Sequence, residues 1–210
     1  MIRRNGLSLF FLVVFLLALI GQSIAGVGSY NDEQIGSGGT TVSWLTYVTS
    51  ADFAVDVAEN WQSEYLQFLL YIVITVWLVQ RGSPESKEKE TGDEIQAGSP
   101  EWAKAQGLRN LLFANSLGIV MGTVFVLSWY AQSVAGTAAY NRQQLSQLQD
   151  PVSWGGYVTS PDFWDRTLQN WQSEFLAVLS MVALAIYLRQ RGSPESKPVG
   201  APHEETGTDS

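Results

Sequence analysis

Long apolar runs without charge alternate with polar segments along the chain. Leu7–Ala25 has no charged residue, and a helix of that length measures about 28 Å, close to the thickness of a bilayer's hydrocarbon core. Leu111–Ala135 is a second such run, and Tyr65–Val79 and Phe175–Leu188 are shorter ones. The shorter runs reach a spanning length if each helix begins at the tryptophan of the NWQSE motif before it. The pattern therefore predicts an all-α membrane protein with four transmembrane helices, at about residues 7–25, 61–80, 111–135 and 171–189.

The overall composition hides this segregation, because the mean hydropathy of +0.03 is close to that of a soluble protein. Polar residues gather in two long segments, 26–60 and 136–170, in a linker at 88–107 and in a tail at 198–210. We expect the linker residues Glu88–Ala97 and the tail to be disordered, since both are polar and acidic.

The second half of the chain is a copy of the first. A shift of 110 residues aligns Asn5–Lys87 with Asn115–Lys197 without a gap, and 37 of the 83 aligned pairs are identical. Both copies end in QRGSPESK, at Gln80–Lys87 and Gln190–Lys197. Two helices per copy return the chain to the same side of the membrane, so the copies are expected to be parallel. The predicted organisation is repeat unit 1 (1–87), a cytoplasmic linker (88–107), repeat unit 2 (108–197) and a cytoplasmic tail (198–210).

The first apolar run admits a second interpretation, as a cleaved secretory signal. Arg3 and Arg4 precede the run, and Ser23–Ala25 before Gly26 has the small-x-small form of a cleavage site. The second repeat carries the same pattern internally, at Ser133–Ala135, where no signal peptide can act. We therefore favour a retained first helix.

Basic residues predict the orientation. Ten of the 12 Lys and Arg fall on one side of the four predicted helices, and Arg142 and Arg166 fall on the other. The positive-inside rule places the larger group, and with it both termini, in the cytoplasm. That group consists of Arg3, Arg4, Arg81, Lys87, Lys89, Lys104, Arg109, Arg189, Arg191 and Lys197.

The two external segments differ in charge. Segment 26–60 has five acidic residues and no basic one, whereas segment 136–170 balances its acids with Arg142 and Arg166. After Ser50 and Ser160 each segment is expected to enter a short amphipathic helix. Ser160 followed by Pro and Asp has the order of residues that starts a helix.

The paired motifs resemble those of a family of bacterial integral membrane proteins classed only as a domain of unknown function. The resemblance rests on NWQSE leading into an apolar helix that ends in QRGSPESK, after an RRNGLSLFF start and a GQSIAG exit. It extends over nearly the whole chain and implies a bacterial inner-membrane location. It implies no activity, since no functional residues come with it.

Several kinds of chemistry lack supporting residues. The chain has no cysteine, and its one histidine, His203, lies in the tail, so thiol, Fe–S and histidine-based metal or triad chemistry find no residues here. No phosphate-binding loop or dinucleotide fingerprint occurs. Gly118 and Gly122 form a GxxxG pattern, which permits close helix packing. We expect a non-enzyme without cofactor or metal, which has the lipid bilayer as its partner and binds no nucleic acid; self-association stays open.

The duplicated NWQSE motif is the candidate site. Residues four apart share a helix face, so Asn60 and Glu64 lie on one stripe that continues through Gln67 and Tyr71. The second copy has Ala177 and Met181 in place of Gln67 and Tyr71. The polar stripe therefore continues toward the centre of the membrane in the first copy only. The candidate polar membrane residues are Asn60, Trp61, Gln62, Ser63, Glu64, Asn170, Trp171, Gln172, Ser173, Glu174, Gln22 and Gln132.

Two interpretations of these residues compete. In the structural one, tryptophan anchors each helix at the interface, glutamate favours the helix N-terminus, and the amides join helices. In the functional one, Glu64 and Glu174 handle protons or cations at the outer mouth of a small transporter. The structural interpretation predicts a scaffold or envelope-associated membrane protein, which we favour.

Overall fold

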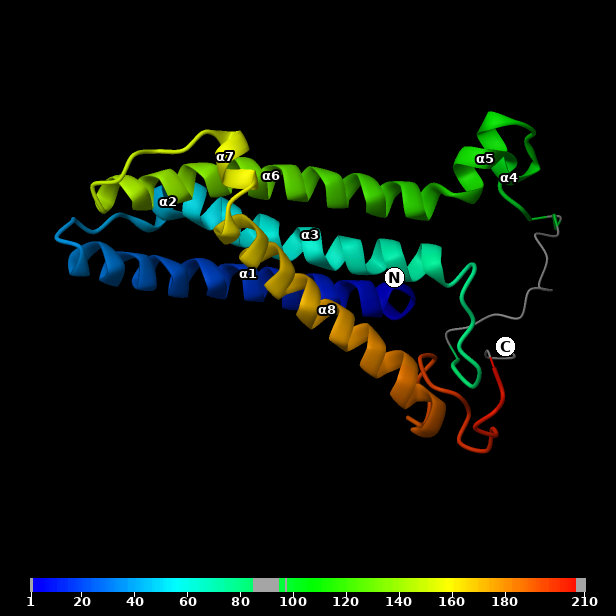
Figure 1. Ribbon diagram of the computed structural model, residues 1–210. Coiled ribbons are helices and arrows are strands. Elements are labelled where there is room, and N and C mark those ends of the chain that lie inside the picture. Colours follow the sequence, from blue (N-terminus) through cyan, green and yellow to red (C-terminus); the bar gives the residue numbers. More distant parts are fainter. Residues whose placement is uncertain (1, 85–94, 97, 207–210) are drawn as a thin grey trace. The chain divides into compact units, whose positions relative to one another are not determined.

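The chain is helical throughout the part that the structure describes. In this computed structural model residues 2–84, 95–96 and 98–206 are described, and no strand occurs among them (Figure 1). The first QRGSPESK beyond Pro84, residues 88–94 and 97 of the predicted linker, and residues 207–210 of the tail lie outside the described residues. The helices are α1 (Ile2–Gly36), α2 (Trp44–Val48), α3 (Ala51–Ile74), α4 (Glu101–Lys104), α5 (Leu108–Ala114), α6 (Ser116–Ser146), α7 (Trp154–Val158) and α8 (Pro161–Tyr187).

Two of these helices are long and apolar enough to cross a membrane, as judged by length and composition: α1 from Asn5 and α6. Most of their apolar side chains are exposed, unlike those of a core helix in a soluble protein. Both extend well past the predicted ends at 25 and 135. The helical path is interrupted at the same repeat position in both copies, because Asn5 leaves helical backbone angles inside α1 and Asn115 does so between α5 and α6. The helices α3 and α8 do not meet the same criterion, and the four-span architecture stays a prediction.

The helices α3 and α8 start earlier than the sequence indicated. The hydroxyls of Ser50 and Ser160 accept hydrogen bonds from the backbone N–H groups of Phe53 and Phe163, each at 3.3 Å, as N-cap residues do. The predicted helix start at Ser160 is confirmed. The helices expected after Ser50 and Ser160 are present, and each runs without interruption into its NWQSE motif as the first part of α3 or α8. Helix α3 ends at Ile74, before the predicted limit at 80, and continues as turns.

The described chain forms two compact units, and neither coincides with a sequence repeat. Unit 1 comprises residues 1–58 and 130–164, and unit 2 comprises residues 59–129 and 165–210. Each unit therefore contains segments of both copies. The repeat boundaries stay a prediction from the sequence.

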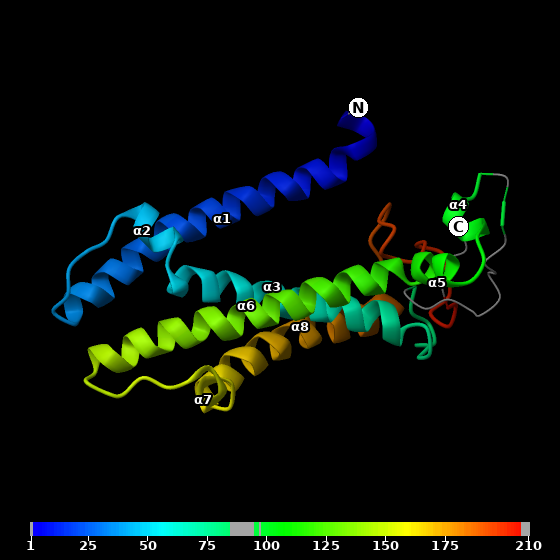
Figure 2. The same ribbon diagram turned by 90° about the horizontal axis from the view of Figure 1, so that it is seen from above.

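Unit 1 contains the same local structure twice. In the first copy Trp44 Nε1 donates to Ser23 Oγ at 3.0 Å, and the Asn31 side chain bonds the backbone N–H and C=O of Val42 at 2.7 and 3.0 Å. Tyr47 packs against Gly26, where a Cβ atom would lie 2.3 Å from the phenol oxygen. Figure 2 shows α2 folded back beside α1. These contacts explain why the intervening loop returns the chain along its own helix.

The second copy repeats these contacts through residues 110 positions later. Trp154 donates to Ser133 at 3.0 Å, Asn141 bonds Val152 at 2.7 and 2.9 Å, and Tyr157 covers Gly136. The short helices α2 and α7, which the hydrophobic pattern did not predict, start at equivalent serine caps. Many of the identities between the repeats are thus residues of one duplicated turn.

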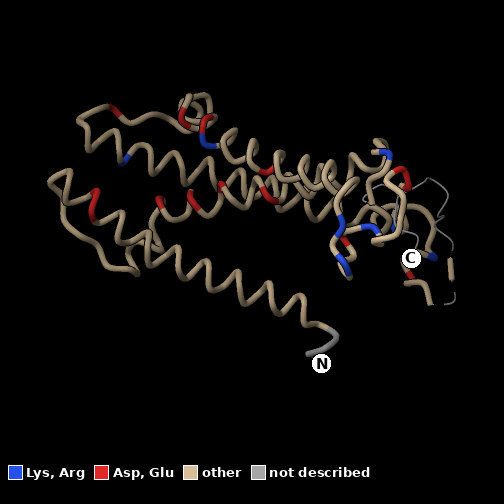
Figure 3. Tube along the Cα trace, turned by 90° about the horizontal axis from the view of Figure 1, so that it is seen from below, with Lys and Arg blue, Asp and Glu red and all other residues tan. Residues whose placement is uncertain are grey.

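Unit 2 is built from packed parts of α3, α6 and α8. A Cβ atom on Gly118 or Gly122 would lie 3.8 or 3.6 Å from Val73 or Leu69. The predicted GxxxG pattern therefore faces α3 at ordinary contact distance. Lys and Arg of this unit gather mainly in the segments that follow α3 and α8 and precede α6 (Figure 3).

The tail of unit 2 wraps around a buried ammonium. Lys197 is 1% exposed, and its Nζ donates to the backbone carbonyls of Pro202, His203 and Glu205 at 2.9–3.1 Å. Burial lowers the pKa of Lys197, and the nearby charge of Arg189 acts in the same direction. This lysine closes the second QRGSPESK, which thereby organises the following residues through 206.

Candidate functional site

The NWQSE motifs lie in the middle of their helices. Glu64 follows the start of α3 at Ala51, and Glu174 the start of α8 at Pro161, by about three and a half turns. The field of a helix N-terminus acts only over the first turn. The suggestion that these glutamates stabilise a helix N-terminus is therefore wrong, and they need another explanation.

The two motifs are not equivalent in burial. Gln62 and Ser63 are buried, whereas their counterparts Gln172 and Ser173 are exposed. Gln62 Oε1 accepts a hydrogen bond from Trp171 Nε1 at 2.9 Å, which joins α3 to α8 within unit 2. This hydrogen bond is a predicted amide link between helices whose geometry the described residues give directly.

The remaining residues of the motifs are more peripheral. Asn60 and Trp61 are exposed, and Asn170 donates to the backbone carbonyl of Arg166 at 3.0 Å within its own helix. Both Ser63 and Ser173 bond the carbonyl three residues earlier, at 2.9 and 2.8 Å. The bonds of Asn170, Ser63 and Ser173 thus stay within one helix, unlike the bond between Gln62 and Trp171.

The other predicted pair, Gln22 and Gln132, also differs in burial between the two copies. Gln132 in α6 is 0% exposed, while Gln22 in α1 is exposed. One glutamine of each duplicated pair is thus buried and the other is at the surface. The duplication has been followed by a division of roles between equivalent positions.

Glu64 and Glu174 lie within range of each other's charge in unit 2. Glu64 is exposed and Glu174 is half-buried. Among the described residues no group of three or more His, Cys, Asp and Glu is arranged to hold a metal ion.

Two ion pairs, which the sequence did not predict as pairs, connect the repeats. Arg142 donates from Nε to Asp52 Oδ2 at 3.1 Å and from Nη2 to Asp52 Oδ1, and it lies 4.9 Å from the Tyr30 ring centre. In unit 2, Arg166 donates to Glu59 at 3.2 Å. The only signal in the sequence was the contrast between an acidic first segment and two arginines in the second.

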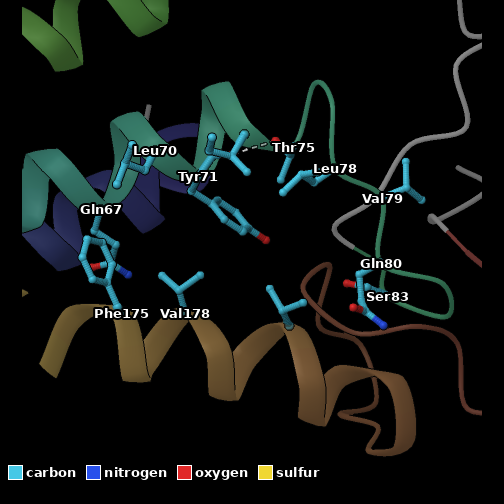
Figure 4. Close-up of a pocket in the computed structure, with 12 residues that line it drawn as sticks. Gln67, Leu70, Tyr71, Thr75, Leu78, Val79, Gln80, Ser83, Phe175 and Val178 are labelled. Atoms are coloured by element: carbon cyan, nitrogen blue, oxygen red, sulfur yellow. Dashed lines mark hydrogen bonds between the residues drawn. The ribbon is translucent and has the colours of Figure 1, made fainter. Parts of the chain in front are cut away.

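Unit 2 also contains a cavity of about 470 Å³ between α3 and α8. Gln67 and Tyr71, which continue the stripe from Glu64, line it (Figure 4). Apolar side chains form most of its wall, and Gln80 and Ser83 lie at one end. The stripe therefore leads into an apolar cavity, not into a water-filled path lined by acids.

The family model for a domain of unknown function, DUF6766, matches residues 1–208. The chain belongs to this family. The resemblance found in the paired motifs is thereby confirmed as far as the family is concerned. No curated protein and no solved structure matches the chain. The DUF6766 description brings no activity with it.

Proposed function

We propose that the protein is a non-enzymatic scaffold of the bacterial inner membrane, with four spans and both termini in the cytoplasm. The observation that carries this proposal is that charged side chains of the two repeats pair with each other. Asp52 and Glu59 of the first repeat bind Arg142 and Arg166 of the second. Groups that neutralise each other in this way hold segments together and are poorly suited to acid–base chemistry.

Exposed apolar surface supports the membrane location. Large apolar side chains along α1 and α6 are exposed, and so are Phe68, Ile74, Leu176 and Leu179 on α3 and α8. Soluble proteins rarely expose continuous apolar surface of this extent. The basic residues that gather beyond one end of the unit 2 helices support a cytoplasmic end there.

The topology can be tested by labelling, because the natural chain has no cysteine. Single cysteines at the exposed positions Ser37 and Ser146 should react with a membrane-impermeant maleimide in intact cells. Cysteines at the exposed positions Gln106 and Glu195 should react only after the cells are permeabilised. Labelling of Glu195→Cys in intact cells would contradict the proposed orientation.

A second candidate is a small proton or cation transporter that uses Glu64 and Glu174. Their proximity favours it, as does the cavity at the inner end of their stripe. The test is flux in liposomes, comparing the intact protein with the double variant Glu64→Gln, Glu174→Gln. A scaffold shows no pH-dependent flux in either protein. A flux that the double variant abolishes, with folding intact, would establish the transporter instead.

A further inference from the structure

The cavity of unit 2 has the size and the mainly apolar lining of a site for a small apolar ligand. Its volume of about 470 Å³ falls within the range of about 300–1,000 Å³ that small-molecule sites occupy. Leu70 and Ile74 from α3 and Phe175, Val178 and Val182 from α8 form its walls. Gln67, Tyr71 and Thr75 add a few polar groups to walls that are otherwise apolar, so the cavity suits a ligand body that is mostly hydrocarbon.

One end of the cavity is polar, because α3 ends early. Beyond Ile74 the chain continues as turns, and Gln80 and Ser83 reach the cavity from this segment (Figure 4). Arg81 stands between them in the chain, and its side chain is 78% exposed. Arg81 follows Gln80 directly, so its guanidinium can reach this end of the cavity, and it would suit an amphiphile with an anionic head.

The carboxylate of Glu204 binds the Arg81 guanidinium, as an anionic head would. Arg81 Nη2 lies 3.0 Å from Glu204 Oε2, and the backbone N–H of Gly82 donates to the Thr206 hydroxyl at 3.0 Å. Both partners of the ion pair are about four-fifths exposed, at 78% and 80%, and an ion pair of this kind contributes little stability. The pair is therefore easily displaced. The bonds from Lys197 to the tail carbonyls keep Glu204 near Arg81 meanwhile.

We propose that this cavity binds one acyl chain of an anionic membrane phospholipid, that Arg81 binds the lipid phosphate, and that Glu204 holds Arg81 in the lipid's absence. A phosphate accepts the two parallel hydrogen bonds that a guanidinium offers, and the Gly82 N–H is a further donor once Thr206 leaves. The proposal rests on the membrane location proposed above. It adds a defined lipid site and a tail that competes for it.

The test uses the full-length protein in detergent with equal amounts of phosphatidylglycerol and phosphatidylcholine of identical acyl chains. Native mass spectrometry counts the lipids retained. We expect about tenfold more phosphatidylglycerol than phosphatidylcholine on the intact protein, which corresponds to one charge-assisted contact. Arg81→Gln should remove the preference, while Arg191→Gln, the exposed equivalent in the second repeat, should keep it.

Two further changes test the cavity and the tail. Val178→Trp should lower the retention of both lipids by filling the cavity, and Val182→Phe serves the same purpose if the first variant does not fold. Glu204→Gln should raise phosphatidylglycerol retention at least twofold by freeing Arg81. Equal retention of the two lipids by the intact protein would overturn the proposal, as would full retention in a folded cavity-filled variant. Because detergent binding does not depend on the number of spans, these outcomes are separate from those of the labelling test.

Discussion

Arg142 binds Asp52 through two parallel hydrogen bonds, and the two residues come from different copies of the duplicated sequence. The position equivalent to Arg142 in the first copy is Asp32, and Arg166, which binds Glu59, is equivalent to Asp56. An acid in one copy is thus a base in the other at both positions. The equivalent residues therefore cannot form the reciprocal pairs, because Asp32 would face Asp162 and Asp56 would face Gln169.

The Arg142–Asp52 pair should be coupled energetically. The side chains are 36% and 18% exposed, which places the pair between surface and buried ion pairs. We expect a double-mutant cycle with Arg142→Gln and Asp52→Asn to give a coupling energy of about 1 kcal/mol. Thermal unfolding in detergent measures it, and the same substitution at the exposed Arg191 serves as the control. A coupling energy of zero would mean that the pair does not hold the repeats together.

Gly26 should not tolerate a methyl group. A Cβ atom there would lie 2.3 Å from the Tyr47 oxygen and 2.8 Å from two of its ring carbons, whereas one on Gly28, in the same helix, meets nothing within 4 Å. We expect Gly26→Ala to destabilise unit 1 by about 1–3 kcal/mol. Gly28→Ala should be neutral or slightly stabilising, because alanine is the better helix former. Equal melting temperatures for the two variants would show that Tyr47 does not pack on Gly26.

The Tyr47 phenol should resist ionisation. Burial raises its pKa, and the charges of Asp56 and Asp52 raise it further. The folded-state pKa therefore lies above the unfolded value of about 10, which means that the folded protein favours the neutral phenol. The resulting contribution to the stability of the folded state is complete below pH 10. That contribution is lost as the pH rises through the folded-state pKa. Absorbance near 295 nm should show a tyrosine that titrates late, and Tyr47→Phe should remove it while keeping the fold.

The Gln62–Trp171 hydrogen bond should contribute to stability where its repeat equivalent does not. Gln62 is 0% exposed and accepts from the half-buried indole of Trp171, so Gln62→Leu removes this hydrogen bond at a cost of about 1 kcal/mol. Gln172→Leu changes the exposed counterpart and should alter the stability by less than about 0.5 kcal/mol. Chemical unfolding of both variants in detergent decides the matter. Similar losses in the two would mean that burial at this position is irrelevant.

The local parts of the structure could be predicted from the sequence because their causes are local. Charge-free apolar runs gave the existence of the four long helices, and the order Ser160-Pro161-Asp162 gave a helix start that the structure confirms. The helix ends were less predictable. Helix α1 continues to Gly36 through polar residues, and α3 stops at Ile74 inside an apolar run. Hydrophobicity reports the environment of a segment, and backbone conformation only indirectly.

The sequence by itself determined the duplication, the helical class, the family and the set of residues that each repeat keeps. Those properties depend only on which residues occur in the chain and in what order. Only the tertiary structure decided which member of each equivalent pair is used: Gln62 is buried and Gln172 is not, and Lys197 gathers the tail around its ammonium. Equivalent residues have the same local sequence, so nothing local distinguishes them. Their burial and their partners depend on contacts between segments far apart in the chain, and those contacts exist only after the chain has folded.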